Sequence, residues 1–278
     1  MKFSLALLLC VIIATQSFAA PVDTLLIHST AMNKDIKCVV ISPSGNPTTA
    51  DTRWSVVYLL HGYGGNYAQW IQTAPQLTQE ATTYNILLVC PDGGYDSWYF
   101  DSSVDSTVRY ETFITKELIP YIDKQYPTRA DNAHRAITGL SMGGHGALYL
   151  AIRHRDLFGA AGATSGGVDF TPFPENWGLK KDLGDYAGHK DNWENNTVIH
   201  AVNDLANGQL KLIFDCGVSD FFLTVNRNLH QKLLDKKIDH DYIEHPGGHN
   251  RDYWRNSIDY QVMFFDKFFN SAPSRQVP

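Results

Sequence analysis

The chain has 278 residues, which suits one α/β domain with a sizeable hydrophobic core. Its composition, 44% hydrophobic and 19% charged, is that of a folded globular protein and excludes disordered and fibrous classes. The formal net charge is −6 and no stretch is strongly basic, so the sequence predicts no nucleic-acid partner.

The N-terminus has the pattern of an export signal. A short positive start precedes the apolar run Leu5–Ala14, and Ser17 and Ala19 are small residues at −3 and −1 of a cleavage site. The apolar run is shorter than the roughly 20 residues that span a bilayer, although an uncleaved anchor is the alternative. We therefore predict a signal peptide over residues 1–19, a mature protein with no stable membrane span, and a secreted or periplasmic location.

Short β-rich runs alternate with helical patterns along the rest of the chain. This alternation is typical of βαβ units and predicts a mostly parallel, eight-stranded sheet flanked by helices. The expected strands are Thr24–Ser29, Lys37–Ser42, Trp54–Leu60, Ile86–Cys90, Ala136–Leu140, Gly159–Thr164, Lys211–Asp215 and Asp241–Glu244. The expected helices are Tyr67–Leu77, Tyr110–Tyr126, Met142–His154, Phe222–Lys236 and Asp252–Phe269.

The sequence contains no repeat and no linker rich in proline and serine, so residues 20–278 are predicted to form a single domain. The segment Gly166–Asn207 is long, polar and rich in aromatic residues, and its two prolines break regular structure. Long loops in compact domains are usually functional, so we expect a small cap-like insertion over a site. The tail from Ser271 onward is expected to be frayed.

Signal cleavage leaves three cysteines, Cys38, Cys90 and Cys216. Cys90 and Cys216 lie in apolar strand-like runs, where a free thiol packs as a small hydrophobic side chain. A Cys38–Cys90 disulfide is the alternative, provided that their two strands are neighbours. No two cysteines have the spacing of a zinc site, and the sequence predicts neither a metal nor an organic cofactor.

The pattern G-x-S-x-G occurs at Gly139–Gly143. It follows the expected strand Ala136–Leu140 and opens a helix, which is the context of a nucleophile elbow. In that sharp turn the glycines avoid clashes, and the turn lifts the hydroxyl of Ser141 above the sheet edge. The sequence predicts Ser141 as the nucleophile and the amide of Met142 as one oxyanion-hole donor. Close packing of helix on strand is the structural alternative for the glycines.

A second glycine-rich turn follows the strand that ends at Leu60, with the sequence HGYGG over residues 61–65. Its position predicts the other oxyanion donor, the amide of Tyr63, whereas His61 is expected to brace the loop. Trp98 and Tyr99 follow the next strand and are expected either to wall the substrate or to pack the loop on the core. Trp70 is also predicted to contact the substrate.

A serine nucleophile needs a histidine base and a carboxylate that fixes the histidine tautomer. In the order typical of an elbow serine, the acid and then the histidine follow the serine. Asp220 lies just past the strand Lys211–Asp215 and is preferred to Asp215, which is still within the strand. His249 follows two glycines and is preferred over His245, which a proline follows. We predict Ser141, Asp220 and His249 as the triad.

Together the motifs HGYGGN, PDGG, SWY, GLSMGG, DCGVSD and GGH resemble the esterase D-like family of α/β hydrolases, over residues 24–269. That family includes S-formylglutathione hydrolases, feruloyl and acetyl-xylan esterases, and mycolyl transferases. The resemblance implies the α/β-hydrolase fold. It also implies the same triad, Ser141, Asp220 and His249, and the same oxyanion donors, the amides of Tyr63 and Met142. Family members often have acidic residues where this chain has Gln69 and Asn250, and this departure leaves the subfamily open.

The predicted function is that of a secreted serine carboxylic-ester hydrolase acting through an acyl-enzyme. Because glutathione thioesters are cytosolic, an export signal favours small-molecule or carbohydrate-linked esters, with feruloyl or acetyl groups on carbohydrate as the leading hypothesis. An acyltransferase and a thioesterase of the S-formylglutathione hydrolase type are the alternatives within the fold. An inactive carbohydrate-binding scaffold is the alternative of another class, and the complete Ser, Asp and His set argues against it.

Overall fold

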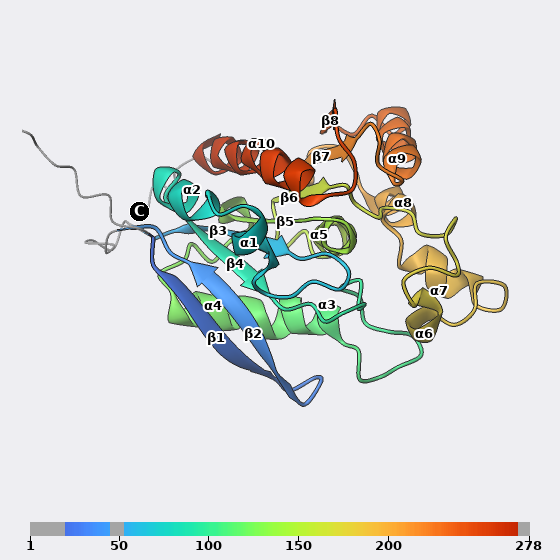
Figure 1. Ribbon diagram of the computed structural model, residues 1–278, viewed down its shortest axis with the longest axis horizontal. Coiled ribbons are helices and arrows are strands. Elements are labelled where there is room, and N and C mark those ends of the chain that lie inside the picture. The colour runs from blue at the N-terminus through green and yellow to red at the C-terminus, as the bar shows by residue number, and fades with distance from the viewer. Residues whose placement is uncertain (1–19, 45–52, 272–278) are drawn as a thin grey trace, which may run out of the picture.

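A computed structural model describes residues 20–44 and 53–271. The predicted signal peptide and the tail after residue 271 lie outside the described residues. The described part forms one eight-stranded sheet in the order β1-β2-β4-β3-β5-β6-β7-β8 (Figure 1). The strands are β1 (Val22–Ser29), β2 (Lys34–Ile41), β3 (Ser55–Leu60), β4 (Ile86–Pro91), β5 (Arg135–Gly139), β6 (Ala160–Thr164), β7 (Lys211–Gly217) and β8 (Asp241–His245).

Strand direction confirms the prediction of a mostly parallel sheet. β1 pairs with β2, and β2 with β4, in antiparallel fashion, whereas every other pair of neighbouring strands, from β4–β3 to β7–β8, is parallel. The central strands β3 and β4 are buried along their whole length, as expected for parallel strands covered on both faces. Because parallel strands end at the same edge, the loops after β3, β5, β7 and β8 meet there.

Helices cover both faces of the sheet. One layer contains α1 (Gln69–Thr73), α2 (Leu77–Thr83) and α10 (Arg251–Ser271), which Figure 1 shows together on one side. The opposite core contains α5 (Met142–Arg153), α9 (Leu223–Asp235) and the helix that starts with α3. The described residues contain no helix that is both long and apolar enough to cross a bilayer.

Two helices differ from the sequence prediction. The expected helix Tyr67–Leu77 is wrong in extent, because α1 ends at Thr73 and a separate α2 begins at Leu77. Pro75 lies between them, and the residue before a proline is disfavoured in helical geometry. The expected helix Tyr110–Tyr126 is one run made of α3 (Tyr110–Thr112), the π-helical turn η1 (Phe113–Leu118) and α4 (Ile119–Gln125).

A proline explains the wide turn in that run. Pro120 has no N–H, and its ring collides with the carbonyl four residues earlier in a regular α-helix. A π-helical turn just before Pro120 widens the helix at this point. Helical periodicity in the sequence therefore placed the element correctly without revealing its internal geometry.

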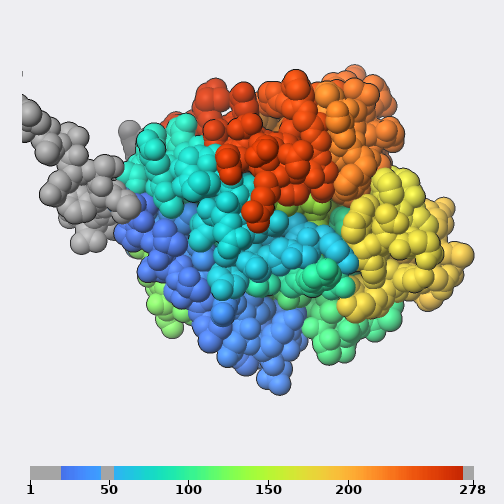
Figure 2. Space-filling view, viewed as in Figure 1, coloured from blue at the N-terminus to red at the C-terminus, as the bar shows by residue number. Residues whose placement is uncertain are grey.

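The segment 166–207 contains three short helices, α6 (Leu179–Leu183), α7 (Lys190–Asn195) and α8 (Val198–Ala201), followed by the 3-10 turn η3 (Val202–Asp204). In Figure 2 it appears in yellow beside the orange C-terminal part of the chain. Its aromatic side chains Phe170 and Trp193 are fully buried and belong to the same hydrophobic core as α5, so the segment is packed onto the sheet domain. A short 3-10 turn, η2 (Asn132–His134), precedes β5 on the other side of the elbow.

Cys38, Cys90 and Cys216 are free and buried. β2 and β4 are neighbours, as the disulfide alternative required, but Val39 and not Cys38 lies opposite Cys90. The one-residue offset sends the two thiols to opposite faces of the sheet, where they join different hydrophobic cores. The alternative of a Cys38–Cys90 disulfide is therefore wrong.

Candidate active site

Ser141 lies in a strained turn between β5 and α5. Its backbone has φ 55° and ψ −116°, in a region that residues with a side chain rarely adopt. The amide of Ser141 donates to the carbonyl of Thr164 on β6 (3.0 Å), and the amide of Gly143 donates to Leu140 (2.7 Å). This is the nucleophile-elbow geometry, with the hydroxyl presented at the edge where the parallel strands end.

Glycine is required at position 143 because the end of β3 approaches it closely. A Cβ atom there would lie 2.3 Å from the carbonyl oxygen of Leu60 and 2.6 Å from that of His61. A Cβ on Gly139 would lie 2.3 Å from the carbonyl oxygen of Gly143. The glycines of the motif thus allow helix α5 to pack directly against the loop after β3, in addition to permitting the turn.

The three predicted triad side chains form one hydrogen-bonded line. Nε2 of His249 lies 2.9 Å from Oγ of Ser141, and Nδ1 lies 2.9 Å from Oδ2 of Asp220. The Asp220 side chain is fully buried, and its Oδ1 accepts a hydrogen bond from the Phe222 amide (2.8 Å). A carboxylate in this position fixes the Nδ1–H tautomer, which leaves Nε2 free to accept the serine proton.

Asp215 and His245, which the sequence analysis did not choose for the triad, make other contacts in the structure. Asp215 is buried inside β7, where it accepts hydrogen bonds from Thr164 Oγ1 and Gln261 Nε2 (both 2.7 Å). Burial raises the pKa of Asp215, and these donors oppose the rise. His245 ends β8 and packs on the ring of Tyr260, 5.0 Å away. Neither residue takes part in the line to Ser141.

The loop after β3 lies against the nucleophile. A Cβ on Gly62 would lie 3.4 Å from Cβ of Ser141, and Tyr63 is the next residue of this loop. His61 is buried and braces the loop, with Nδ1 2.8 Å from the Gly62 carbonyl oxygen and Nε2 accepting from the Gly93 amide (2.7 Å). Met142 is the first residue of α5, where helix amides have no intrahelical acceptor.

Trp70, Trp98 and Tyr99 are not brought to the surface of the site. Each has at most 1% of its surface exposed. Trp70 Nε1 donates to the Leu60 carbonyl (2.9 Å), and the Tyr99 hydroxyl donates to the His61 carbonyl (3.1 Å). Trp70 and Tyr99 therefore anchor the site loops from the core side, and Trp98 packs on His145 and Phe170. For Trp98 and Tyr99 this is the packing alternative of the sequence analysis.

Sequence reasoning gave no role in the site to three residues that the structure places at the triad or at the loop after β3. Gln69 Oε1 accepts a hydrogen bond from the Gly62 amide (2.8 Å) and so fixes the loop that carries Tyr63. Phe221 is 52% exposed and contacts the His249 ring, with centroids 4.3 Å apart. Trp177, from the segment 166–207, stacks on Phe221. The only sequence signal for Phe221 was its place next to Asp220.

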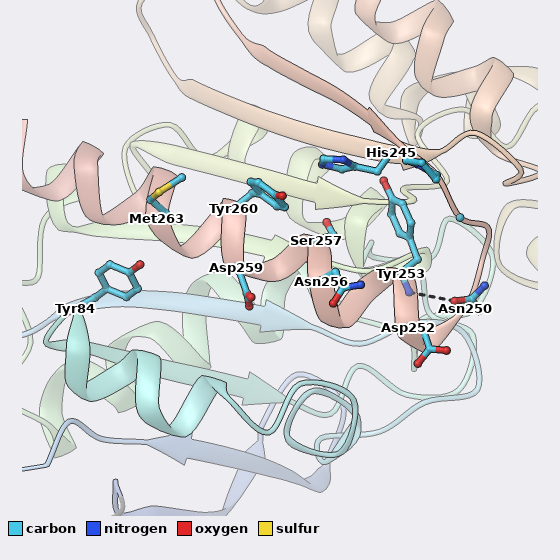
Figure 3. A pocket seen from close by; sticks show the side chains of 12 residues that line it. Tyr84, His245, Asn250, Asp252, Tyr253, Asn256, Ser257, Asp259, Tyr260 and Met263 are labelled. Atoms are coloured by element: carbon cyan, nitrogen blue, oxygen red, sulfur yellow. Dashed lines mark hydrogen bonds between the residues drawn. The ribbon is translucent and has the colours of Figure 1, made fainter. Parts of the chain in front are cut away.

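A groove of about 820 Å³ lies on the outer side of α10 (Figure 3). Its lining includes Gly247 and Asn250 from the loop that carries His249, and the exposed side chains of Tyr260 and Met263. The lining includes none of the three triad residues, so the groove is separate from the hydrogen-bonded line at Ser141.

The fold and the site together define a class. A mostly parallel sheet carries a strained serine at a strand–turn–helix elbow, and the carboxylate and histidine come from loops after later strands in the order Ser, Asp, His. This is the arrangement of serine hydrolases with the α/β-hydrolase fold.

Comparison with known proteins gives the family. The chain belongs to the Esterase family, described as "Putative esterase", whose profile matches residues 29–265. It is therefore a serine esterase. An acetyl esterase from Caldicellulosiruptor saccharolyticus is 28% identical over 217 residues, covering 73% of this chain and 79% of the relative.

Two further relatives are feruloyl esterases by name. An endo-1,4-beta-xylanase/feruloyl esterase from Xylanibacter ruminicola is 34% identical over 123 residues, covering 42% of this chain and 17% of that protein. A solved structure of a ferulic acid esterase superposes with a TM-score of 0.79 at 26% identity, covering 91% of this chain and 100% of that chain.

Proposed function

We propose that the chain hydrolyses carboxylic esters of carbohydrates, with acetyl or feruloyl acyl groups, through an acyl-enzyme on Ser141. The observation that carries the proposal is the 2.9 Å contact of Ser141 Oγ with His249 Nε2 at a strained elbow. The names of the acetyl and feruloyl esterase relatives support this substrate class.

In the proposed reaction Oγ of Ser141 attacks the ester carbonyl carbon while His249 Nε2 takes the hydroxyl proton. Asp220 stabilises the imidazolium through Nδ1. The amides of Tyr63 and Met142 donate to the oxyanion of the tetrahedral intermediate, and one such donor is typically worth about a hundred- to a thousandfold in rate. His249 then protonates the leaving alcohol, and water attacks the acyl-enzyme by the same route.

A hydrolysis panel tests this function. Wild-type protein is compared on p-nitrophenyl acetate, p-nitrophenyl butyrate, methyl ferulate and acetylated or feruloylated xylan fragments. We expect Ser141→Ala to abolish turnover of all of them and the control Ser219→Ala, at an exposed serine in the Asp220 loop, to keep it. Wild-type activity in Ser141→Ala would contradict the proposal.

We also propose that the protein is exported, on the basis of its N-terminal sequence. Expression of the full chain in a bacterial host, followed by N-terminal sequencing of the extracellular and periplasmic protein, tests this. A mature chain that starts at Ala20 is the expected result, and a chain that keeps Met1 in the cytoplasm would contradict it.

A further inference from the structure

A large apolar side chain is exposed directly beside the triad. Phe221 follows Asp220 and leaves 52% of its surface open, although its ring centroid is only 4.3 Å from that of His249. Its backbone is fixed on both sides, because the amides of Phe222 and Leu223 donate to the side chain and the carbonyl of Asp220. Phe221 therefore places a half-exposed aromatic ring directly against the triad histidine.

Trp177, from the segment 166–207, contributes a second aromatic ring beside Phe221. Its ring lies nearly parallel to that of Phe221, at 23° with centroids 6.1 Å apart. Trp177 has a φ of 53°, and its ring packs on Phe173 and Phe222, 5.4 and 5.2 Å away. Strained backbone held by dense packing is characteristic of ligand-binding positions.

Polar groups lie next to the aromatic face. Lys181 and Asp96 form an ion pair (3.0 Å) beside Gly178, the residue after Trp177, since a Cβ there would lie 3.4 Å from Asp96 Oδ2. A sugar ring has the matching chemistry, with an apolar C–H face that packs on aromatic rings and hydroxyl groups that hydrogen-bond at its edge. A purely apolar alcohol would leave the ion pair unused.

The reaction places the leaving group on this side. The alcohol oxygen must lie within hydrogen-bond distance of His249 Nε2 to receive its proton. Since Phe221 packs on the same imidazole, the alcohol half of the ester is the part of the substrate that meets it.

We propose that Phe221 and Trp177 form a leaving-group subsite that stacks on the sugar ring of a carbohydrate ester. This inference rests on the proposed function and deepens it, because it assigns the specificity for the alcohol to two residues. The subsite binds the sugar and leaves the chemical step to the triad, so its loss should raise KM for sugar esters.

The test compares the arabinose ester and the methyl ester of ferulic acid, which share the acyl group and differ in the alcohol. In Phe221→Ala we expect kcat/KM for the arabinose ester to fall about tenfold, equivalent to 1.4 kcal/mol, mainly through KM. The methyl ester should change less than threefold. Phe221→Tyr should restore the ratio, and Trp177→Phe should show a smaller loss than Phe221→Ala.

Tyr260→Ala is the matched control, since Tyr260 is an exposed aromatic residue on α10 outside the triad. Equal losses on both esters in Phe221→Ala would overturn the inference and show that Phe221 only positions His249. An unchanged ratio in an active variant would also overturn it. Wild-type protein that hydrolyses the methyl ester but no sugar ester would instead refute the carbohydrate part of the proposed function.

Discussion

The close approach of the nucleophile helix to the end of β3 predicts a large effect of one methyl group. In Gly143→Ala the new Cβ would lie 2.3 Å from the Leu60 carbonyl oxygen, whereas ordinary contact begins near 3.4 Å. The three nearest atoms all belong to the backbone of Leu60 and His61, so they cannot rotate away. Either the elbow or the loop after β3 must therefore move by about 1 Å, because interiors are close-packed.

A shift of this size separates Ser141 from the loop that carries Tyr63. Misplacement by about 1 Å can cost roughly a hundredfold in rate, so we expect kcat/KM on p-nitrophenyl acetate to fall by about that factor. Overpacking should lower the free energy of unfolding by about 1–3 kcal/mol, measured by urea denaturation followed by circular dichroism.

Gly188→Ala is the control for this change. The three atoms nearest to a Cβ on Gly188 all belong to the exposed side chain of Asp185, at 3.2 Å or more, and a small adjustment of that side chain relieves the contact. We expect wild-type activity and stability in this variant. A folded Gly143→Ala protein with more than a tenth of wild-type activity would refute the argument that backbone contact fixes the elbow against the loop.

Three further predictions concern groups that are half-buried or buried. Burial, and then the nearby Asp259 carboxylate, raise the pKa of Glu80 from 4.5 to about 8, so the free energy of unfolding should fall as pH rises between these values. Glu80→Gln should reduce that fall by about 1–2 kcal/mol, measured by urea denaturation at pH 5 and at pH 9. An equal fall in the variant and in the wild type would contradict this. Asp215→Ala leaves two buried donors without their acceptor and should cost about 2–4 kcal/mol in the same assay, with Asp215→Asn costing less. The three buried thiols should resist iodoacetamide in the native protein and react in urea, as mass spectrometry would show, and labelling of the native protein would contradict their burial.

Much of the fold followed from patterns that are local in the sequence. All eight strands were predicted close to their observed positions, because each is a short β-rich run bounded by turn residues. The split between α1 and α2 was missed, although Pro75 was visible, because apolar spacing continues across it. The register of β2 on β4, which decided against the disulfide, depends on pairing between strands 50 residues apart and has no local signal.

For the site, the informative feature of the sequence is that the serine, the aspartate and the histidine follow the ends of parallel strands in that order. It predicts that Ser141, Asp220 and His249 lie at one edge, and the structure joins the three side chains by hydrogen bonds. Whether an aromatic residue faces the substrate or the core depends on tertiary packing, so the burial of Trp98 could not be read from its neighbours. The exposure of Phe221 depends in the same way on a segment more than 40 residues earlier in the chain.

The most direct test of the proposed reaction is covalent labelling of the nucleophile. After brief incubation with a fluorophosphonate, peptide mapping by mass spectrometry should find one adduct, on Ser141, and the His249→Ala variant should label at least a hundredfold more slowly. An adduct on a different serine, or an unchanged labelling rate in His249→Ala, would contradict the assignment of Ser141, His249 and Asp220 as a catalytic unit.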